Sequence, residues 1–187
     1  MTEMVEIRPL APDSWPDLCA LFGRNGANSG CWCMWWRESA NEWAEGNNAN
    51  RERFEQVVTS GEPTGLLAYA DGNPVGWCAV APREAYPRLF RSPHLKPADP
   101  DESGVWSVSC FFIKRTHRRQ GLRRTLLDAA VDHAGRMGAA VVEGYPVDTR
   151  EKPSGDLFTG TVDLFLEAGF AEHIARGGRR IVMRRRP

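Results

Sequence analysis

The hydrophobic residues of this chain alternate or recur at regular spacing in a series of short segments. Loose alternation with polar residues over 5–10 predicts a first strand. Apolar runs flank Asp71-Gly72, a pair that tolerates the backbone angles of a tight turn, and predict a hairpin over 65–82. Residues 105–113 become apolar on both faces, which is typical of a central strand.

Helical spacing of apolar residues marks the segments between these strands. The helix expected over 120–138 joins the strand at 105–113 to another buried strand at 139–146, and a crossover helix makes two such strands parallel. The Gly- and Asn-rich stretch 23–50 is expected to be irregular or only partly helical. The remaining predictions are helices over 13–22, 50–61 and 161–169, and two strands within 171–185 joined at Gly177-Gly178.

Length and composition describe one soluble globular domain. The 187 residues are 42% hydrophobic and 26% charged, and they suffice for a single core. No stretch approaches the roughly 20 consecutive apolar residues of a membrane-spanning helix, and the first ten residues do not resemble a secretory signal. We therefore expect a cytoplasmic protein that does not enter a membrane. Its five cysteines form no disulfide framework and are expected to be thiols.

Charge is balanced overall but uneven along the chain. Lys and Arg number 24 and so do Asp and Glu, which argues against bulk attraction to nucleic acid or an anionic membrane. Residues 114–124, however, contain six cationic side chains and no carboxylate, and residues 179–186 contain five arginines. Such clusters suit a polyanionic small molecule, although the C-terminal one is also consistent with a solvated charged surface.

The junction between the strand at 105–113 and the following helix carries the clearest chemical signal. Gly121 stands at the helix entry after a basic turn, where backbone N–H groups lack helical partners and the helix dipole favours an anion. The sequence there contains neither the GxxxxGK[ST] of a P-loop nor the GxGxxG of a dinucleotide fold. The pattern therefore predicts a pyrophosphate site of another kind.

This junction resembles motif A of the GNAT superfamily of acyl-CoA-dependent N-acetyltransferases. That motif is a strand ending in apolar residues, then Arg/Gln-x-x-Gly-x-Gly/Ala, then a helix that soon reads Leu-Leu. The chain has Phe111-Phe112-Ile113, Arg118-Arg119-Gln120-Gly121-Leu122-Arg123 and Leu126-Leu127 at these places, and "FLEAGF" at 165–170 resembles another helix end of the family. The resemblance implies a single α/β domain over 1–187, with a mixed, mostly antiparallel central sheet flanked by helices and a central parallel strand pair.

The resemblance also implies acetyl-CoA as the acyl donor and no metal. The backbone of Phe111, Phe112 and Ile113 would pair with the pantetheine arm. The amides of the following turn would hold the pyrophosphate, and the residues implied are Arg118, Arg119, Gln120, Gly121, Leu122, Arg123 and Arg124. The chain departs from the family pattern twice: Arg123 replaces a small residue, and Phe165 stands where many members have a tyrosine that protonates the departing thiolate.

Amine acetylation requires a neutral amine, and hence a route for its proton. Glu143 lies on the strand after motif A, at a position where some members place a glutamate, and is the expected base. Tyr145 is two residues away and so lies on the same strand face, where it can replace the missing tyrosine as acid. The alternatives are a carboxylate paired with a nearby arginine and a half-buried aromatic residue.

The stretch "GCWCMWWR" at 30–37 concentrates two thiols and three indoles. Cys31-x-Cys33 supplies two ligands, too few for zinc, and lacks the Cys-x-x-Cys spacing of redox enzymes. The segment is either part of the core or, as in GNAT proteins, a wall on the acceptor side. If it is helical, Trp32 and Trp36 face the same cavity and can hold an ammonium by cation–π contact, while Arg37 meets a carboxylate.

The sequence therefore predicts an N-acetyltransferase that moves an acetyl group from acetyl-CoA to the amine of a small molecule by direct attack. Alternatives are a protein N-terminal or lysine acetyltransferase and a non-catalytic acyl-CoA-binding module, which the phenylalanine at 165 favours. Nucleic-acid binding is the least consistent with zero net charge. Exposed strands near the C-terminus favour a homodimer.

Overall fold

The computed structural model describes residues 5–149 and 157–187 and contains a seven-stranded sheet in the order β1-β2-β3-β4-β5-β7-β6. Neighbouring strands run antiparallel except for the parallel pair β4 and β5, which confirms the predicted mixed α/β fold. The strands are β1 Val5–Pro9, β2 Gly65–Ala70, β3 Asn73–Pro82, β4 Val105–Ile113, β5 Val141–Gly144, β6 Ala171–Ile174 and β7 Val182–Arg185.

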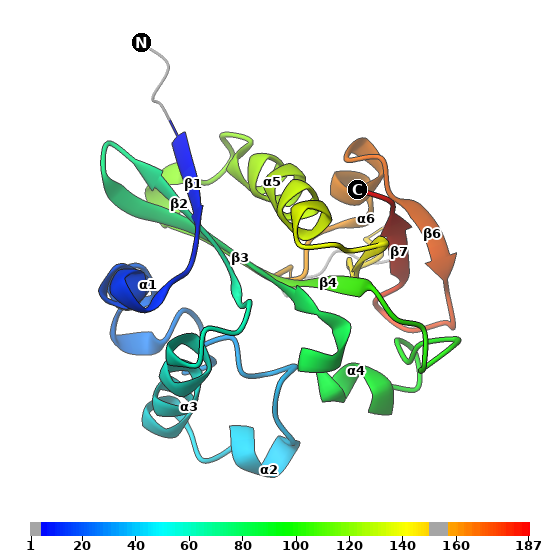
Figure 1. Ribbon diagram of the computed structural model, residues 1–187, viewed down its shortest axis with the longest axis horizontal. Helices are drawn as coiled ribbons and strands as arrows, with labels where there is room; N and C mark the ends of the chain where they lie inside the picture. The colour runs from blue at the N-terminus through cyan, green and yellow to red at the C-terminus, as the bar shows by residue number, and fades with distance from the viewer. Residues whose placement is uncertain (1–4, 150–156) are drawn as a thin grey trace.

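Helices cover both faces of the sheet (Figure 1). On one face α5 and α6 pack with the apolar side chains of β2 to β5, and on the other α1 and α3 enclose a second core with β2 and β3. The α-helices are α1 Trp15–Phe22, α2 Ala40–Trp43, α3 Asn47–Thr59, α4 Pro87–Arg91, α5 Leu122–Arg136 and α6 Val162–Glu167. Short 3-10 turns are η1 Pro12–Ser14, η2 Gly23–Asn25, η3 Arg83–Ala85 and η4 Arg115–His117.

Local sequence explains where these elements begin and end. Asp71 and Gly72 have positive φ angles of 47° and 76° and form the predicted hairpin turn between β2 and β3. The Thr161 side chain accepts a hydrogen bond from the Leu164 N–H and starts α6. The strand expected at 139–146 is shorter than predicted, since Pro146 has no N–H with which to continue a ladder.

The parallel pair separates in the middle of β4. Val105 to Val108 pair with Val141 to Gly144, but on the other side of β4 the register jumps from Val108 opposite Val80 to Cys110 opposite Ala79. Ser109 is therefore an extra, bulged residue, and bulges bend a strand away from its partner. Beyond it, β4 continues without β5, and this divergence positions the site described below.

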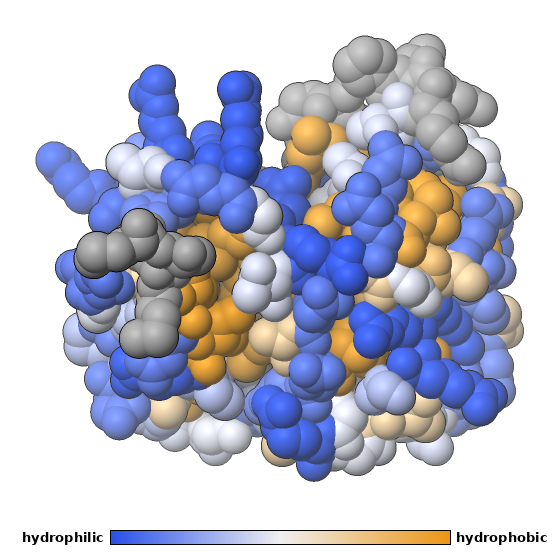
Figure 2. Space-filling view, turned by 90° about the horizontal axis from the view of Figure 1, so that it is seen from above, coloured by the Kyte–Doolittle hydropathy of each residue, from blue (hydrophilic) through white to orange (hydrophobic). Residues whose placement is uncertain are grey.

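The surface of the molecule is mixed in character. On the face seen in Figure 2, long hydrophilic side chains project from one edge and apolar patches lie between polar residues. Within the described ranges, no helix has the length and apolar character needed to cross a membrane.

Candidate active site

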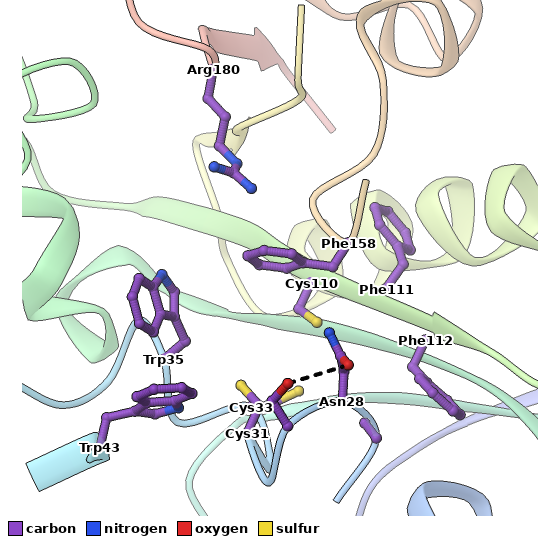
Figure 3. Close-up of a pocket in the computed structure, with 12 residues that line it drawn as sticks. Asn28, Cys31, Cys33, Trp35, Trp43, Cys110, Phe111, Phe112, Phe158 and Arg180 are labelled. Carbon is purple, nitrogen blue, oxygen red and sulfur yellow. Dashed lines mark hydrogen bonds between the residues drawn. The ribbon is translucent and has the colours of Figure 1, made fainter. Parts of the chain in front are cut away.

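A pocket of about 280 Å³ lies where β4 leaves β5. Its walls come from the segment 27–35, from Trp43, from Cys110 to Phe112 on β4, and from Phe158 and Arg180. Figure 3 shows that these side chains converge from several elements, with three sulfur atoms at the base and the guanidinium of Arg180 reaching in from the segment before β7. The pocket is therefore mainly aromatic and sulfur-lined, with one cation at its rim.

The segment 27–35 is held in an unusual backbone shape. Ala27, Ser29, Trp32 and Cys33 all have positive φ angles, between 45° and 70°. Such conformations are costly for residues with a side chain and persist only where the surroundings impose them. The surroundings here include Asn50, whose Nδ2 donates to the Gly30 carbonyl at 2.9 Å.

Two of the three thiols of the pocket, those of Cys31 and Cys110, have raised pKa values. Burial raises the pKa of Cys31, with Cys33 adding to the shift. A hydrogen bond with Cys33, together with burial, raises the pKa of Cys110 well above its ordinary value. A raised pKa disfavours the nucleophilic thiolate. Over 5–149 and 157–187, no three His, Cys, Asp or Glu side chains are arranged to hold a metal ion.

The start of α5 lies just beyond the end of β4 and offers an anion site. Gly121 has a left-handed φ of 79°, and a Cβ placed on it would meet nothing within 4 Å. No acceptor within the described residues is bonded to the main-chain N–H groups of residues 119–123. Exposed, unpaired N–H groups at the positive end of a fifteen-residue helix are suited to a phosphate.

The basic residues of this turn divide into different roles. Arg118 donates through Nε to the Ile113 carbonyl at 3.0 Å and so ties the turn to the end of β4. The Arg123 guanidinium carbon lies 5.9 Å from the centroid of the Phe111 ring, and burial lowers the pKa of this side chain. Arg123 therefore points along β4 toward the pocket, whereas Arg124 pairs with Asp128 at 2.7 Å.

One main-chain hydrogen bond occupies the edge of β4 where the pantetheine arm is predicted to pair. The Phe111 N–H, which β5 no longer pairs, donates to the Phe158 carbonyl at 2.6 Å. The backbone of Phe158 thus takes the place beside β4 that the resemblance gives to the cofactor arm. An arm that pairs with Phe111 has to displace this carbonyl.

Comparison with known proteins connects this arrangement to a family. The sequence model described as the acetyltransferase (GNAT) family matches residues 29–158, well over half of the chain. The chain belongs to the GNAT acetyltransferase family. This confirms the resemblance seen at the β4–α5 junction.

Solved structures of GNAT enzymes have the same fold. The PaiA N-acetyltransferase of Thermoplasma acidophilum in complex with coenzyme A is 14% identical, with a TM-score of 0.59 over 98% of this chain and 99% of its own. A ribosomal-protein-alanine N-acetyltransferase from Brucella melitensis is 18% identical, with a TM-score of 0.53 over 97% and 99% of the two chains. The ribosomal-protein-S18-alanine N-acetyltransferase of Escherichia coli is 14% identical, with a TM-score of 0.54 over 97% and 92%. No curated protein sequence matches the chain.

Within this GNAT fold, the side chains of Glu143 on β5 and of Tyr145 just after it lie on the same side of the chain, but neither lines the pocket. The Glu143 carboxylate is 2% exposed and accepts hydrogen bonds from Arg83 at 3.3 Å and from Arg184 at 2.6 and 2.8 Å. The Tyr145 hydroxyl contacts Glu143 at 2.9 Å and Ser107 at 2.6 Å.

This geometry favours the ion-pair alternative for Glu143. Burial and the neighbouring Glu143 raise the pKa of Tyr145 well above its ordinary value, which makes its proton harder to release. The ring of Trp36 lies 6.4 Å from that of Tyr145 and 6.4 Å from that of Phe158, so it stands between the pair and the pocket wall. The acid and base roles stay predictions.

The segment 30–37 does not form a helix, so Trp32 and Trp36 do not share a face. Trp32 is 3% exposed, packs on Trp15 and Phe22, and belongs to the core under α1. Trp36 donates to the Ser109 carbonyl at 3.2 Å. Arg37 stacks over Tyr86, with 4.9 Å between its guanidinium carbon and the ring centroid.

Residues that the sequence reasoning missed supply the pocket wall in their place. Trp35 and Trp43 meet edge to face with 5.0 Å between ring centroids, and both line the pocket. Cys110 of β4 also lines it, because the bulge at Ser109 reorients the strand. No local pattern indicated Phe158, and Arg180 was singled out only as part of the basic cluster 179–186. Both arrive from distant segments.

Phe165, which stands where many family members have a tyrosine, lies in the core. It is fully buried and packs on Phe111 and Phe170 at centroid distances of 6.4 and 4.9 Å. Gly144 and Gly160 both lie against its ring, where a Cβ would come within 3 Å.

Proposed function

We propose that the protein transfers the acetyl group of acetyl-CoA to the amine of a small molecule. The observation that carries this is the start of α5, where unpaired N–H groups and open space beside Gly121 adjoin a pocket at the divergence of β4 and β5. The chain belongs to the GNAT acetyltransferase family, and the PaiA N-acetyltransferase of the same fold was solved in complex with coenzyme A.

The reaction is a direct attack. The neutral amine nitrogen forms a bond to the acetyl carbon, the bond from that carbon to sulfur breaks, and the sulfur takes the electron pair and then a proton. The raised pKa values of Cys31 and Cys110 argue against either thiol as a covalent nucleophile. The edge-to-face pair Trp35 and Trp43 offers an apolar, electron-rich wall that can hold the amine beside β4.

The size and lining of the pocket support a small acceptor over a protein. A volume of about 280 Å³ is close to the lower limit of ordinary small-molecule sites. The rival is a protein N-terminus, because the Escherichia coli and Brucella melitensis enzymes are named for ribosomal-protein alanine. We further propose that residues 1–187 form one domain, since strands from both ends of the chain share one sheet. We also propose that the protein acts in the cytoplasm.

Calorimetric titration with acetyl-CoA tests the donor site. Gly121→Asp places a carboxylate among the proposed phosphate-binding amides, and we expect it to abolish binding while the protein stays folded. Gly138→Asp is a matched control, since Gly138 also has a left-handed φ and open space but lies at the far end of α5. Equal binding by the parent and Gly121→Asp would overturn the assignment.

Release of the coenzyme A thiol in the presence of a panel of amines tests turnover. Acetylation of at least one small amine, with a lower rate for peptides bearing free N-termini, is the expected result. Binding of acetyl-CoA without turnover of any amine or peptide would instead support a non-catalytic acyl-CoA-binding module.

A further inference from the structure

A second, cationic hollow opens beside the acetyl-transfer pocket. Its volume is about 470 Å³, and it shares Trp35 and Arg180 with the first pocket. None of the described side chains that line it is acidic. Its polar walls are Arg88 and Arg91 of α4, His94 after that helix, and Arg179 and Arg180 before β7. We call this hollow the arginine groove.

Arg88 is the best-positioned cation of the arginine groove. Its guanidinium carbon stacks 3.9 Å from the centroid of the Trp35 ring, and its Nε donates to the Glu38 carbonyl at 3.1 Å. Its Nη2 is buried and has no hydrogen-bond partner among the described residues. Buried donors are nearly always paired, so an orphaned one beside a hollow indicates an acceptor that arrives from outside.

Carboxylates near the groove are already engaged elsewhere. Glu38, close to Arg88, forms an ion pair of 3.1 Å with Arg53. Glu42, close to Arg91, caps α2 by accepting from the Ser39 N–H at 2.8 Å. Glu38 interacts electrostatically with Arg88, and Glu42 with Arg91, but neither carboxylate lines the groove.

The two hollows meet at an aromatic and cationic boundary. Trp35 packs edge to face with Trp43 in the first pocket and carries Arg88 on its face. Arg180 lies over the Phe158 ring at 4.9 Å and donates to Thr159 at 3.0 Å, which holds its guanidinium at the rim of both (Figure 3). Trp35 and Arg180 therefore form a wall that the two hollows share.

We infer that the acceptor amine also carries an anionic group, a carboxylate or phosphonate, which the arginine groove binds while the amine points at β4. This rests on the proposed function, because it takes the first pocket as the place of acetyl transfer. Planar guanidinium groups bind such oxyanions in a bidentate manner, which would fix the distance and direction of the amine. The groove lies at α4 and the chain before β7, apart from the amides at the start of α5.

A binding experiment tests the groove without turnover. The probes are N-acetylglycine, which has the carboxylate, and N-acetylglycinamide, which lacks it, titrated into protein saturated with coenzyme A. We expect the carboxylate probe to bind about tenfold more tightly or better, and Arg91→Gln and Arg88→Gln to remove the difference. Arg88→Lys should restore part of it. Arg136→Gln, an exposed arginine at the end of α5, is the matched control and should change nothing.

A turnover experiment separates this inference from the proposed function. Pairs of amino acids and their amides are compared as acceptors, and the acids should have kcat/KM values about tenfold higher or more. In Arg91→Gln this preference should disappear because KM for the acids rises. Tighter binding of the carboxylate probe without turnover of any amine would support the anion site in the arginine groove and contradict the proposed acetyltransferase activity. Turnover with equal rates for acids and amides, or no preference for the carboxylate probe, would overturn the inference. Competition between the probe and coenzyme A would assign the groove to the donor and overturn it as well.

Discussion

The hydroxyl of Tyr145 donates a hydrogen bond of 2.9 Å to Oε2 of Glu143, two residues earlier on β5. The other carboxylate oxygen of Glu143 binds the guanidinium groups of Arg83 and Arg184, so both oxygens are occupied. Arg83 is fully buried and Glu102 joins the same cluster through Arg184. The hydrogen bond from Arg184 lowers the pKa of Glu102. The cluster links η3, β5 and β7 beneath the pocket.

Glu143→Gln should therefore act first on stability. Removing the charge leaves the buried Arg83 with only Glu102 as an ionic partner, and we expect the free energy of unfolding to fall by about 3 kcal/mol. Denaturant unfolding followed by far-UV circular dichroism measures this change. A loss below about 0.5 kcal/mol, typical of exposed ion pairs, would show that the cluster contributes little.

Tyr145→Phe separates a structural role of the cluster from acid–base chemistry. It removes one hydroxyl from a fully buried ring and should cost about 1 kcal/mol. If the cluster only supports the site, the pH profile of kcat/KM between pH 6 and 9 keeps its shape in both variants. Loss of one limb of that profile in Glu143→Gln, with the fold retained, would establish the predicted base.

Trp35 and Trp32 should respond differently to truncation. Trp32→Ala removes a ring from the core between Trp15 and Phe22, and a cost of about 3–5 kcal/mol is expected. Trp35 is half-buried at the pocket, so Trp35→Ala should lose less stability but raise KM for the amine. Thermal unfolding and steady-state kinetics of the two variants make the comparison. A raised KM in Trp32→Ala with little loss of stability would instead support the sequence prediction that Trp32 binds the acceptor.

The contrast between these tryptophans shows what the sequence could and could not predict. Strands and helices were predictable because their apolar periods are local, and the β4–α5 junction was predictable because the proposed phosphate-binding turn lies within consecutive residues. The segment 30–37 was not, since positive φ angles at Trp32 and Cys33 break the helical spacing on which the pairing of Trp32 with Trp36 depended.

Long-range contacts account for the remaining differences. The period of two correctly placed Glu143 and Tyr145 on one side of the chain. It carried no information on Arg83, which comes from η3, sixty residues earlier, and donates a hydrogen bond to the Glu143 carboxylate. Likewise, Phe158 and Arg180 reach the pocket from segments that the sequence gives no reason to associate with β4. Such partners depend on how distant elements pack.

The Cys31 thiol should be slow to alkylate, and acetyl-CoA should protect it. Since burial raises the pKa of Cys31, the thiolate fraction near pH 7.5 is small, and its reaction with iodoacetamide should accelerate as the pH is raised through 9 and beyond. Peptide mass spectrometry measures labelling with and without acetyl-CoA. Cys19, which lies outside the pocket, is an internal control that acetyl-CoA should leave unprotected. Rapid labelling of Cys31 at pH 7 would contradict the protonated state.

His133 on α5 should make the protein less stable in mild acid. Its ring meets Trp106 edge to face at 5.9 Å, and burial, reinforced by the neighbouring Arg136, lowers its pKa. Below the ordinary value of about 6.5, the unfolded chain binds a proton at this site that the folded protein does not, so stability falls as the pH drops through that value.

Replacement of His133 isolates this contribution from that of other titrating groups. Between pH 7.5 and 5.5 the melting temperature of His133→Gln should fall less than that of the parent, because the variant has no proton to gain at this position. Arg136→Gln should give an intermediate slope, since it removes the nearby positive charge but leaves the burial. A parent and His133→Gln that lose equal stability over this range would show that the ring titrates alike in the folded and unfolded chains.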